Sequence, residues 1–392
     1  MILRLSSSAQ RASLLAAALF SAAFLSCFSI RNARAEHFAG LETPEGFSHA
    51  VELEPGNARN WFLLGHYWLY NLEDPDVARA IRAFQTSASY DPHSADTWLD
   101  LASAYESQGN LASARDAFRS AKQAYPLSAE GAWRYGNFLL RVGEQDAAFA
   151  EIRHAVEADP KLAAEAFSRC MRVHPDLRDI LDRVLPPSRD GYLSVMLDLL
   201  GDRNTGDALI VWSRLAALHP QLSMRDVFPL VEALMLKKQL LLARQVWDQG
   251  AIFAGLTHLD PPGSLVWDGG FESGFFGAGF AWRLPPPFGE GVQTSLDESE
   301  KHSGKRSLRL LFDGKHNVHF RDLCQYVIVQ PSTAYRFSAW VRTQALTTDQ
   351  GIRFRLNAIS TLDIRGTQPW TNIEIPWTSG EDVNELQLCV QR

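Results

Sequence analysis

The side chains that could perform chemistry are scattered along this sequence rather than gathered into a catalytic motif. The chain contains no G-x-S-x-G, Walker loop, H-E-x-x-H or C-x-x-C sequence. His316 and His319 lie three residues apart in a stretch with strand character, so they would face opposite sides of a strand rather than share a metal. The acids Asp297, Glu298 and Glu300 lie in a polar stretch that is typical of a loop. We therefore expect a binding protein and not an enzyme.

A second group of side chains suits recognition of an acidic glycan. Strict alternation over residues 335–341 indicates a strand whose apolar side chains point inward, and residues 352–356 alternate in the same way. The residues expected on the outward face are Arg336, Ser338, Trp340, Arg342, Arg353, Arg355 and Asn357. An indole ring can stack on a pyranose while guanidinium groups donate to hydroxyls or carboxylates. The alternative is a solvated face on which arginine side chains cover Trp340.

Composition and charge limit the class of protein. The 392 residues are 46% hydrophobic and 21% charged, which is enough for two or three ordinary domains and excludes a disordered chain. Only one apolar run approaches the length of a bilayer span, so a polytopic membrane protein is excluded. The formal net charge of −7 argues against a nucleic-acid binder, which needs a basic stripe.

The first 35 residues have the order of an export signal. Arg4 and Arg11 precede an uncharged run over residues 12–30, and a small-x-small sequence at residues 33–35 predicts cleavage before Glu36. The protein would then be exported across the inner membrane and would be periplasmic or associated with the cell envelope. Arg31 and Arg34 are unusual near a cleavage site, so an uncleaved anchor at residues 14–30 is the alternative.

Residues 37–256 repeat with a period of 34. Three columns share this spacing: Ala80, Ala114 and Ala148; Phe84, Phe118 and Ile152; Pro92, Pro126 and Pro160. A small residue lets two helices approach, a large residue seals the contact between them, and proline ends the second helix. We expect five or six helix hairpins stacked into an α-solenoid.

The copy at residues 95–126 resembles the tetratricopeptide repeat family column by column. The matching residues are Trp98, Leu101, Ala102, Tyr105, Gly109, Ala114, Phe118, Ala121 and Pro126. The resemblance implies a protein partner bound along the first helix of each pair. The family's groove positions correspond here to Arg59, Phe62, His66, Asp96, Leu99, Ser103, Arg134 and Phe138. Phe62 and Leu99 replace two cationic positions, so we do not expect a carboxylate clamp but an extended or helical peptide.

The pattern changes to period 2 in residues 264–392, which predicts a separate β-sandwich. Residues 265–272 with Trp282, residues 303–310 and residues 335–342 resemble the jelly-roll carbohydrate-binding modules, which are related to galactose-binding-like domains. That family adds a closing strand, so the resemblance implies either a truncated sequence or an unpaired sheet edge after residues 385–390. It also implies a structural calcium near Glu272, whose alternative role is that of an exposed turn acid. We expect no other cofactor.

Two cysteines, Cys324 and Cys389, fall in this β-rich region, and export would permit a disulfide between them. The leading hypothesis is a non-catalytic exported adaptor that binds a protein through its helices and a glycan through its sandwich, in assembly or export of a cell-surface polysaccharide. The alternative is a protein-interaction scaffold whose sandwich is structural or docks a protein. A third interpretation, a glycoside-active enzyme, requires two carboxylates about 5 to 10 Å apart in one cleft.

Overall fold

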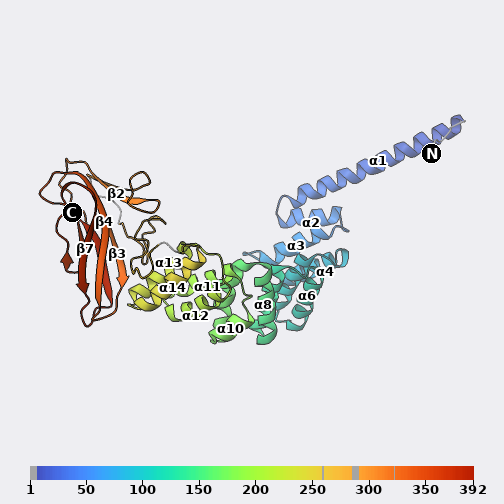
Figure 1. Cartoon of the computed structure of the whole chain (residues 1–392). Coiled ribbons are helices and arrows are strands. Elements are labelled where there is room, and N and C mark those ends of the chain that lie inside the picture. The colour runs from blue at the N-terminus through green and yellow to red at the C-terminus, as the bar shows by residue number, and fades with distance from the viewer. Residues whose placement is uncertain (1–6, 258–259, 285–290, 322) are drawn as a thin grey trace. The chain divides into compact units, whose positions relative to one another are not determined.

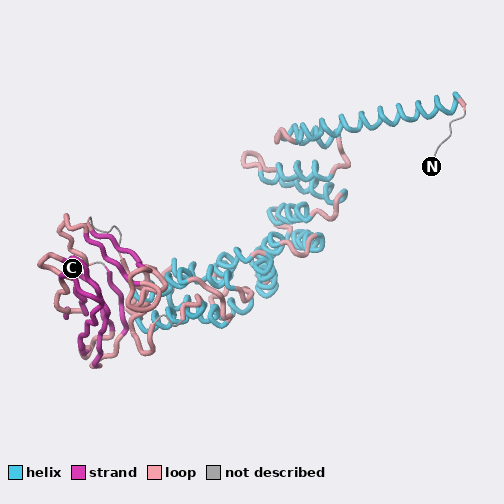
Figure 2. Tube along the Cα trace, turned by 45° about the horizontal axis from the view of Figure 1, so that its top comes forward, coloured by secondary structure: helices cyan, strands magenta, loops and turns pink. Residues whose placement is uncertain are grey.

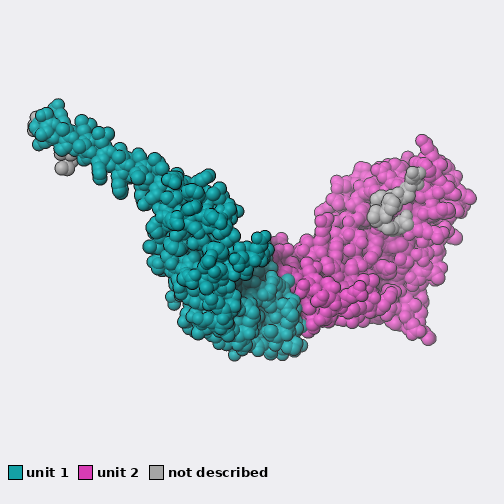
Figure 3. Space-filling model, turned by 180° about the vertical axis from the view of Figure 1, so that it is seen from behind, with its two compact units in different colours: residues 1–186 teal, residues 187–392 magenta. Residues whose placement is uncertain are grey.

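The computed structural model describes residues 7–257, 260–284, 291–321 and 323–392. In these residues 14 α-helices precede eight antiparallel β-strands (Figure 1), which confirms the predicted order of helices followed by a β-rich region. The chain divides into two compact units, residues 1–186 and 187–392 (Figure 3). The predicted limits at residues 37–256 and 264–392 stay predictions.

All the regular secondary structure in the described residues of the first unit is helical (Figure 2). Their bounds are α1 Ser8–Ala39, α2 Pro44–Leu53, α3 Ala58–Tyr70, α4 Val77–Tyr90, α5 Ala95–Ser107, α6 Leu111–Ala124, α7 Ala129–Arg141, α8 Gln145–Ala158, a 3-10 turn at Pro160–Leu162, α9 Ala163–Met171 and α10 Leu177–Arg183. The regular pairs are α3 with α4, α5 with α6 and α7 with α8. The region from α9 to α10 has shorter helices, where the sequence loses its register.

The helix pairs close as the repeat columns predict. The alanine column Ala80, Ala114 and Ala148 is fully buried, and the large column Phe84, Phe118 and Ile152 is at most 2% exposed. A Cβ atom on Gly65 would lie 2.8 Å from the Phe84 ring, so the first helix of that pair approaches the second as closely as glycine allows.

The turns between pairs also repeat. Trp98 Nε1 donates to the carbonyl of Pro92 at 2.9 Å, and Trp61 Nε1 donates to that of Pro55 at 2.8 Å. The next helix then begins at a polar cap, as where Ser94 Oγ accepts from the Thr97 backbone N–H. The same turn chemistry in successive copies orients the first helices alike.

Helix α1 extends well beyond the repeats. Its last turns pack on α2, where Ala35 is fully buried and Ala39 is 7% exposed. The preceding residues carry large apolar side chains that are exposed, among them Phe20 at 74% and Leu19 at 69%. By length and composition this helix can cross a membrane, although a signal sequence meets the same criterion.

The second unit combines four helices with all the strands. Their bounds are α11 Arg189–Gly201, α12 Thr205–Ala217, α13 Met224–Leu236, α14 Leu240–Phe253, β1 Val292–Asp297, β2 Ser307–Phe312, β3 Leu323–Ile328, β4 Ala334–Leu346, β5 Arg353–Leu356, β6 Ile359–Ser360, β7 Gly366–Thr378 and β8 Glu385–Gln391. The sheets are β1–β2, β3–β8–β5–β6 and β4–β7. Strand β8 lies between β3 and β5, and β3 forms one edge of this four-stranded sheet.

The sheets share one apolar core. Phe354 and Leu356 of β5 lie in it, and Phe337 of β4 packs against it with its ring centroid 5.1 Å from that of Phe354. The inward positions of β4 and β5 are therefore those that alternation predicts. The sheet that contains β4 and the sheet that contains β5 meet through these side chains. Their other faces therefore point away from each other.

The helices and strands of this unit are joined by an aromatic cluster. Trp247 of α14 has no exposed surface and lies edge-on to Trp267, with ring centroids 5.1 Å apart, and to Phe280 at 6.0 Å. An ion pair between Glu232 of α13 and Arg283, 2.7 Å long, lies beside it. The last helix pair and the β-rich region are thus packed together instead of being separated by a free linker.

Candidate functional site on the first helices

A column of three polar residues runs across the first helices of successive repeats. Asp100 and Arg134 occupy the same position on α5 and α7, 34 residues apart, whereas His66 lies three residues beyond the matching position of α3. His66 Nδ1 lies 2.9 Å from one carboxylate oxygen of Asp100, and Arg134 donates to the other at 2.9 Å. Tyr70 donates to that second oxygen at 3.2 Å. We call these four residues the polar ladder.

The ladder is held in place by burial and by hydrogen bonds. Asp100 is only 4% exposed, so its charge depends on its partners. Arg134 also donates to Ser103 Oγ at 2.8 Å and to the carbonyl of Leu99 at 3.0 Å. Burial, and then the negative charge of Asp100, raises the pKa of Tyr70, which therefore stays protonated. Burial lowers the pKa of Arg134, but the hydrogen bond and charge of Asp100 outweigh it and the net pKa is raised.

Several of the predicted groove residues lie on this surface. His66 and Asp96 are exposed, and Phe62, Ser103 and Arg134 are half-buried.

The other predicted groove residues lie elsewhere or are already engaged. Arg59 is exposed and pairs with Glu36 at 2.9 Å. The prediction is wrong for two positions: Leu99 is 2% exposed and Phe138 is fully buried. Both face the core between the helices, so they support the surface without reaching a ligand.

Two members of the ladder were missed by the sequence reasoning. Asp100 and Tyr70 are not groove positions of the family, yet Asp100 holds His66 and Arg134 together. The repeat register contains part of the signal, because it places Asp100 and Arg134 at matching positions of neighbouring first helices, which stack along the solenoid. His66 and Tyr70 reach Asp100 from the following turns of α3, which the register does not show.

The geometry favours binding of a polypeptide over capture of a free carboxylate. The guanidinium of Arg134 is paired with Asp100, so its charge is already neutralised. What remains exposed is an aromatic and polar stripe on α3, in which His66 lies 4.6 Å from the Tyr70 ring and 5.7 Å from the Phe62 ring, centroid to centroid. Rigid rings and fixed donors suit a peptide backbone and its side chains.

The predicted glycan-binding residues do not form one surface. Arg336, Trp340 and Arg342 are on β4, whereas Arg353, Arg355 and Asn357 lie on or directly after β5 in the other sheet. Since the inner faces of these sheets meet in the core, the two outward sets point in opposite directions. The second set is also engaged locally: Arg353 lies 3.6 Å from Asp363, and Arg355 donates to the carbonyl of Asn357 at 3.1 Å. The prediction of a single surface is wrong because alternation assigns a face to each strand but does not say which strands share a sheet.

The β4 set has a different neighbourhood. Trp340 is 49% exposed, and the His302 ring stacks on it with centroids 4.0 Å apart. Trp370 of β7 lies edge-on to His302 at 5.9 Å. Arg342 is ion-paired with Glu300. This aromatic patch was not predicted, because His302 comes from the β1–β2 turn.

The surroundings of Glu272 do not fit a calcium ion. Its carboxylate accepts the backbone N–H of Lys305 at 2.7 Å. Across the described ranges no group of three His, Cys, Asp or Glu side chains could hold a metal. Glu272 thus connects two loops through a hydrogen bond to the backbone.

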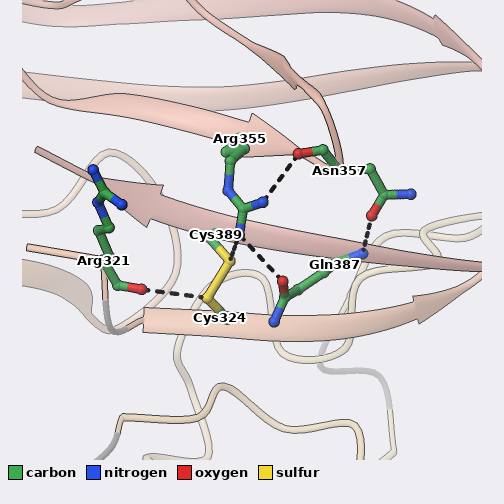
Figure 4. The surroundings of a disulfide bond; sticks show 6 residues. All are labelled: Arg321, Cys324, Arg355, Asn357, Gln387 and Cys389. Carbon is green, nitrogen blue, oxygen red and sulfur yellow. Dashed lines mark hydrogen bonds between the residues drawn. A yellow bond between two sulfur atoms is a disulfide. The ribbon is translucent and has the colours of Figure 1, made fainter.

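A disulfide joins Cys324 of β3 to Cys389 of β8, which face each other in the strand register with Cα atoms 4.1 Å apart. Figure 4 shows Arg355 beside it, donating to Cys389 Sγ at 3.5 Å and to Gln387 at 3.2 Å. Asn357 Oδ1 accepts the Gln387 backbone N–H at 2.9 Å. Two of the residues predicted to bind a glycan therefore support this strand pair.

A comparison with protein-family models finds a match within the helical region. Residues 72–129 match the tetratricopeptide repeat. The matched stretch includes all of α4, α5 and α6, so the ladder residue Asp100 belongs to a tetratricopeptide repeat. A comparison with curated proteins finds no match.

Several solved structures are similar to parts of the chain. The crystal structure of MamA is 17% identical and covers 44% of this chain and 84% of its own, with a TM-score of 0.30. YrrB, described as a TPR protein with an unusual peptide-binding site, is 14% identical and covers 55% and 96%, with a TM-score of 0.29. PilF of Pseudomonas aeruginosa is 13% identical and covers 60% and 95%, with a TM-score of 0.32.

Proposed function

We propose that this chain is a non-catalytic scaffold that binds a partner protein through the exposed face of its first helices. The polar ladder supports this most directly. Its buried Asp100 fixes three partners from α3 and α7 at 2.9 to 3.2 Å, so the surface is already ordered before a partner arrives. Preorganised side chains lose little entropy on binding. The exposed rings of α3 add apolar contact area beside these fixed donors.

Site-specific photocrosslinking in cells that produce the full chain tests this proposal. A benzoylphenylalanine at Tyr70, which is 47% exposed, should give a discrete adduct with one partner. The same substitution at Tyr125, which is 57% exposed at the end of α6, is the matched control and should give none. Equal adducts from both positions, or no adduct from position 70, would contradict binding on the first helices.

A second candidate function, binding of a glycan by the β-rich region, rests on Trp340. The indole of Trp340 is half-exposed although His302 stacks on one side of it, so it still offers aromatic surface to a sugar. The jelly-roll resemblance and a role in assembly or export of a cell-surface polysaccharide belong to this proposal.

We expect Trp340→Ala to weaken retardation of the full chain in gels that contain an acidic polysaccharide. If stacking of a sugar on the ring is comparable to stacking of a base, loss of one ring costs about 1–3 kcal/mol, so the affinity should fall by about fivefold or more. Arg353→Ala, on the opposite sheet face, is the control and should change nothing. If no polysaccharide retards the unmodified chain, glycan binding is ruled out and the scaffold function is the one that remains.

The N-terminal helix and the disulfide together support a proposal of export. Disulfides persist in oxidising compartments, and α1 can serve as a signal or as an anchor. The intact mass of the protein from its native cells decides both points, because cleavage before Glu36 removes 35 residues and disulfide formation removes two hydrogens. A full-length mass with free thiols at Cys324 and Cys389 would contradict export.

A further inference from the structure

One repeat contains an open groove on the side of the second helices, away from the polar ladder. It lies between α4 and α6, with α5 as its floor, and has a volume of about 440 Å³. Its walls carry small side chains, among them Ala88 and Ala117. Trp98 and Tyr105 of α5 line it, together with the carboxylate of Asp116.

The next repeat shows that this opening is not a general feature of the fold. At the positions 34 residues further on, Ala88 and Ala117 are replaced by Lys122 and Glu151, whose side chains form an ion pair 2.5 Å long. The counterpart of Ser120 is His154, which bonds to the carbonyl of Pro126 at 2.9 Å. These side chains fill the equivalent space, which measures only about 10 Å³.

The aromatic floor is specific to this repeat as well. Ala132 and Leu139 stand where Trp98 and Tyr105 would recur. The groove therefore combines small walls with two rings, whereas its neighbour combines large walls with none at those positions. Packing between repeats does not by itself require that small wall residues and two aromatic floor residues occur in the same copy.

The two rings are fixed and correctly spaced for an extended peptide. Trp98 Nε1 donates to the carbonyl of Pro92, and Gln85 Nε2 donates to the Tyr105 hydroxyl at 2.7 Å. Each ring is therefore fixed in position by a hydrogen bond. Seven residues of α-helix separate them by about 10.5 Å along the axis. One turn of a polyproline II helix is about 9.3 Å long, so successive prolines of a P-x-x-P segment can each meet one ring.

Hydrogen bonding and charge favour the same occupant. The Tyr105 hydroxyl accepts from Gln85, which leaves its own O–H to donate to a ligand carbonyl, and polyproline II carbonyls are all available. Asp116 contributes a carboxylate to the groove; its side chain is 76% exposed and lies 3.5 Å from the guanidinium of Arg119, an exposed pair of a kind that contributes little. A cationic residue in the ligand would complement it.

We propose that the groove between α4 and α6 binds a proline-rich segment of a partner protein that carries an arginine or lysine beside its P-x-x-P turn. This site is separate from the first-helix surface and does not depend on it. The partner would lie in polyproline II conformation, with two prolines on Trp98 and Tyr105 and its cation next to Asp116.

Fluorescence anisotropy of labelled decapeptides with the full chain in detergent tests the proposal. PPLPPRPPLP should bind, GGLGGRGGLG should not, and PPLPPEPPLP should bind about tenfold more weakly than the arginine peptide. Asp116→Lys should weaken the arginine peptide about tenfold, since attraction becomes repulsion at an exposed site. Asp96→Lys, the same change on the first-helix face of α5, should leave its affinity within twofold.

A second set of variants fills the groove. Ala88→Lys combined with Ala117→Glu installs the ion pair of the next repeat and should abolish binding. Ser120→His, on a half-buried position, gives a milder version if the double variant does not fold. Equal binding of the glycine peptide, no effect of Asp116→Lys, or a loss caused by Asp96→Lys instead would each overturn the proposal, and the last would assign the peptide to the first-helix face.

Discussion

Replacing Trp247 with alanine should destabilise the second unit by about 3–5 kcal/mol, the usual cost of deleting a large buried aromatic side chain. For a unit of this size the melting temperature should fall by about 10 °C. The reason is the position of the ring: it has no exposed surface and contacts aromatic residues from both the helical and the β-rich segments. Removing it opens a cavity that neither segment can close alone.

The shared cluster also predicts how the unit unfolds. Gly279 has a left-handed φ of 54°, and any Cβ there would overlap the Trp247 ring, so the loop is fitted closely to α14. Backbone amide hydrogen exchange should therefore lose protection at the same temperature in α13 and α14 and in the strands of the full chain. Two separate transitions, with only the helical one shifted by Trp247→Ala, would contradict this coupling.

Two matched variants isolate the effect. Trp340→Ala removes an indole that is 49% exposed and should cost less than about 1 kcal/mol. Trp247→Phe keeps an aromatic ring and removes an indole N–H that is buried without a hydrogen-bond partner in the described residues, so it should cost less than half as much as the alanine variant.

The sequence predicted which side chains are buried wherever a regular period runs through several turns or residues. The 34-residue spacing predicted the buried columns of Ala114 and Phe118, and alternation predicted the inward side chains of β4. It was insufficient for contacts between elements. Arg336 and Arg353 follow the same alternation, yet strand pairing places them on opposite outer faces.

Two kinds of contact explain the remaining differences in the site. Leu99 and Phe138 correspond to groove positions of the family, but in this chain the apolar side chains enter the core, because burial outweighs a position inherited from a motif. Asp100 was overlooked since a lone aspartate on a helix is ordinarily solvated; its role follows only from its neighbours in the preceding and following repeats.

Removing the disulfide with Cys324→Ala and Cys389→Ala should destabilise the β-rich region by about 4 kcal/mol. The two residues are 65 apart in sequence, and closing a loop of that length removes roughly this much chain entropy from the unfolded state. Alanine is the suitable replacement, because Cys389 is fully buried and a serine hydroxyl would need a partner there.

Thiol chemistry provides the control for this measurement. Cys27 lies exposed on α1, whereas burial raises the pKa of Cys170 to about 12 and keeps it as an unreactive thiol. Iodoacetamide should therefore modify only Cys27 in the folded, unreduced chain. After reduction of the disulfide and partial unfolding of the β-rich region, it should also modify Cys324 and Cys389. Cys27→Ala should leave the melting temperature unchanged. If the double alanine variant melts at the same temperature as the unmodified chain, the backbone pairing of β3 with β8 holds these two strands together without the covalent link.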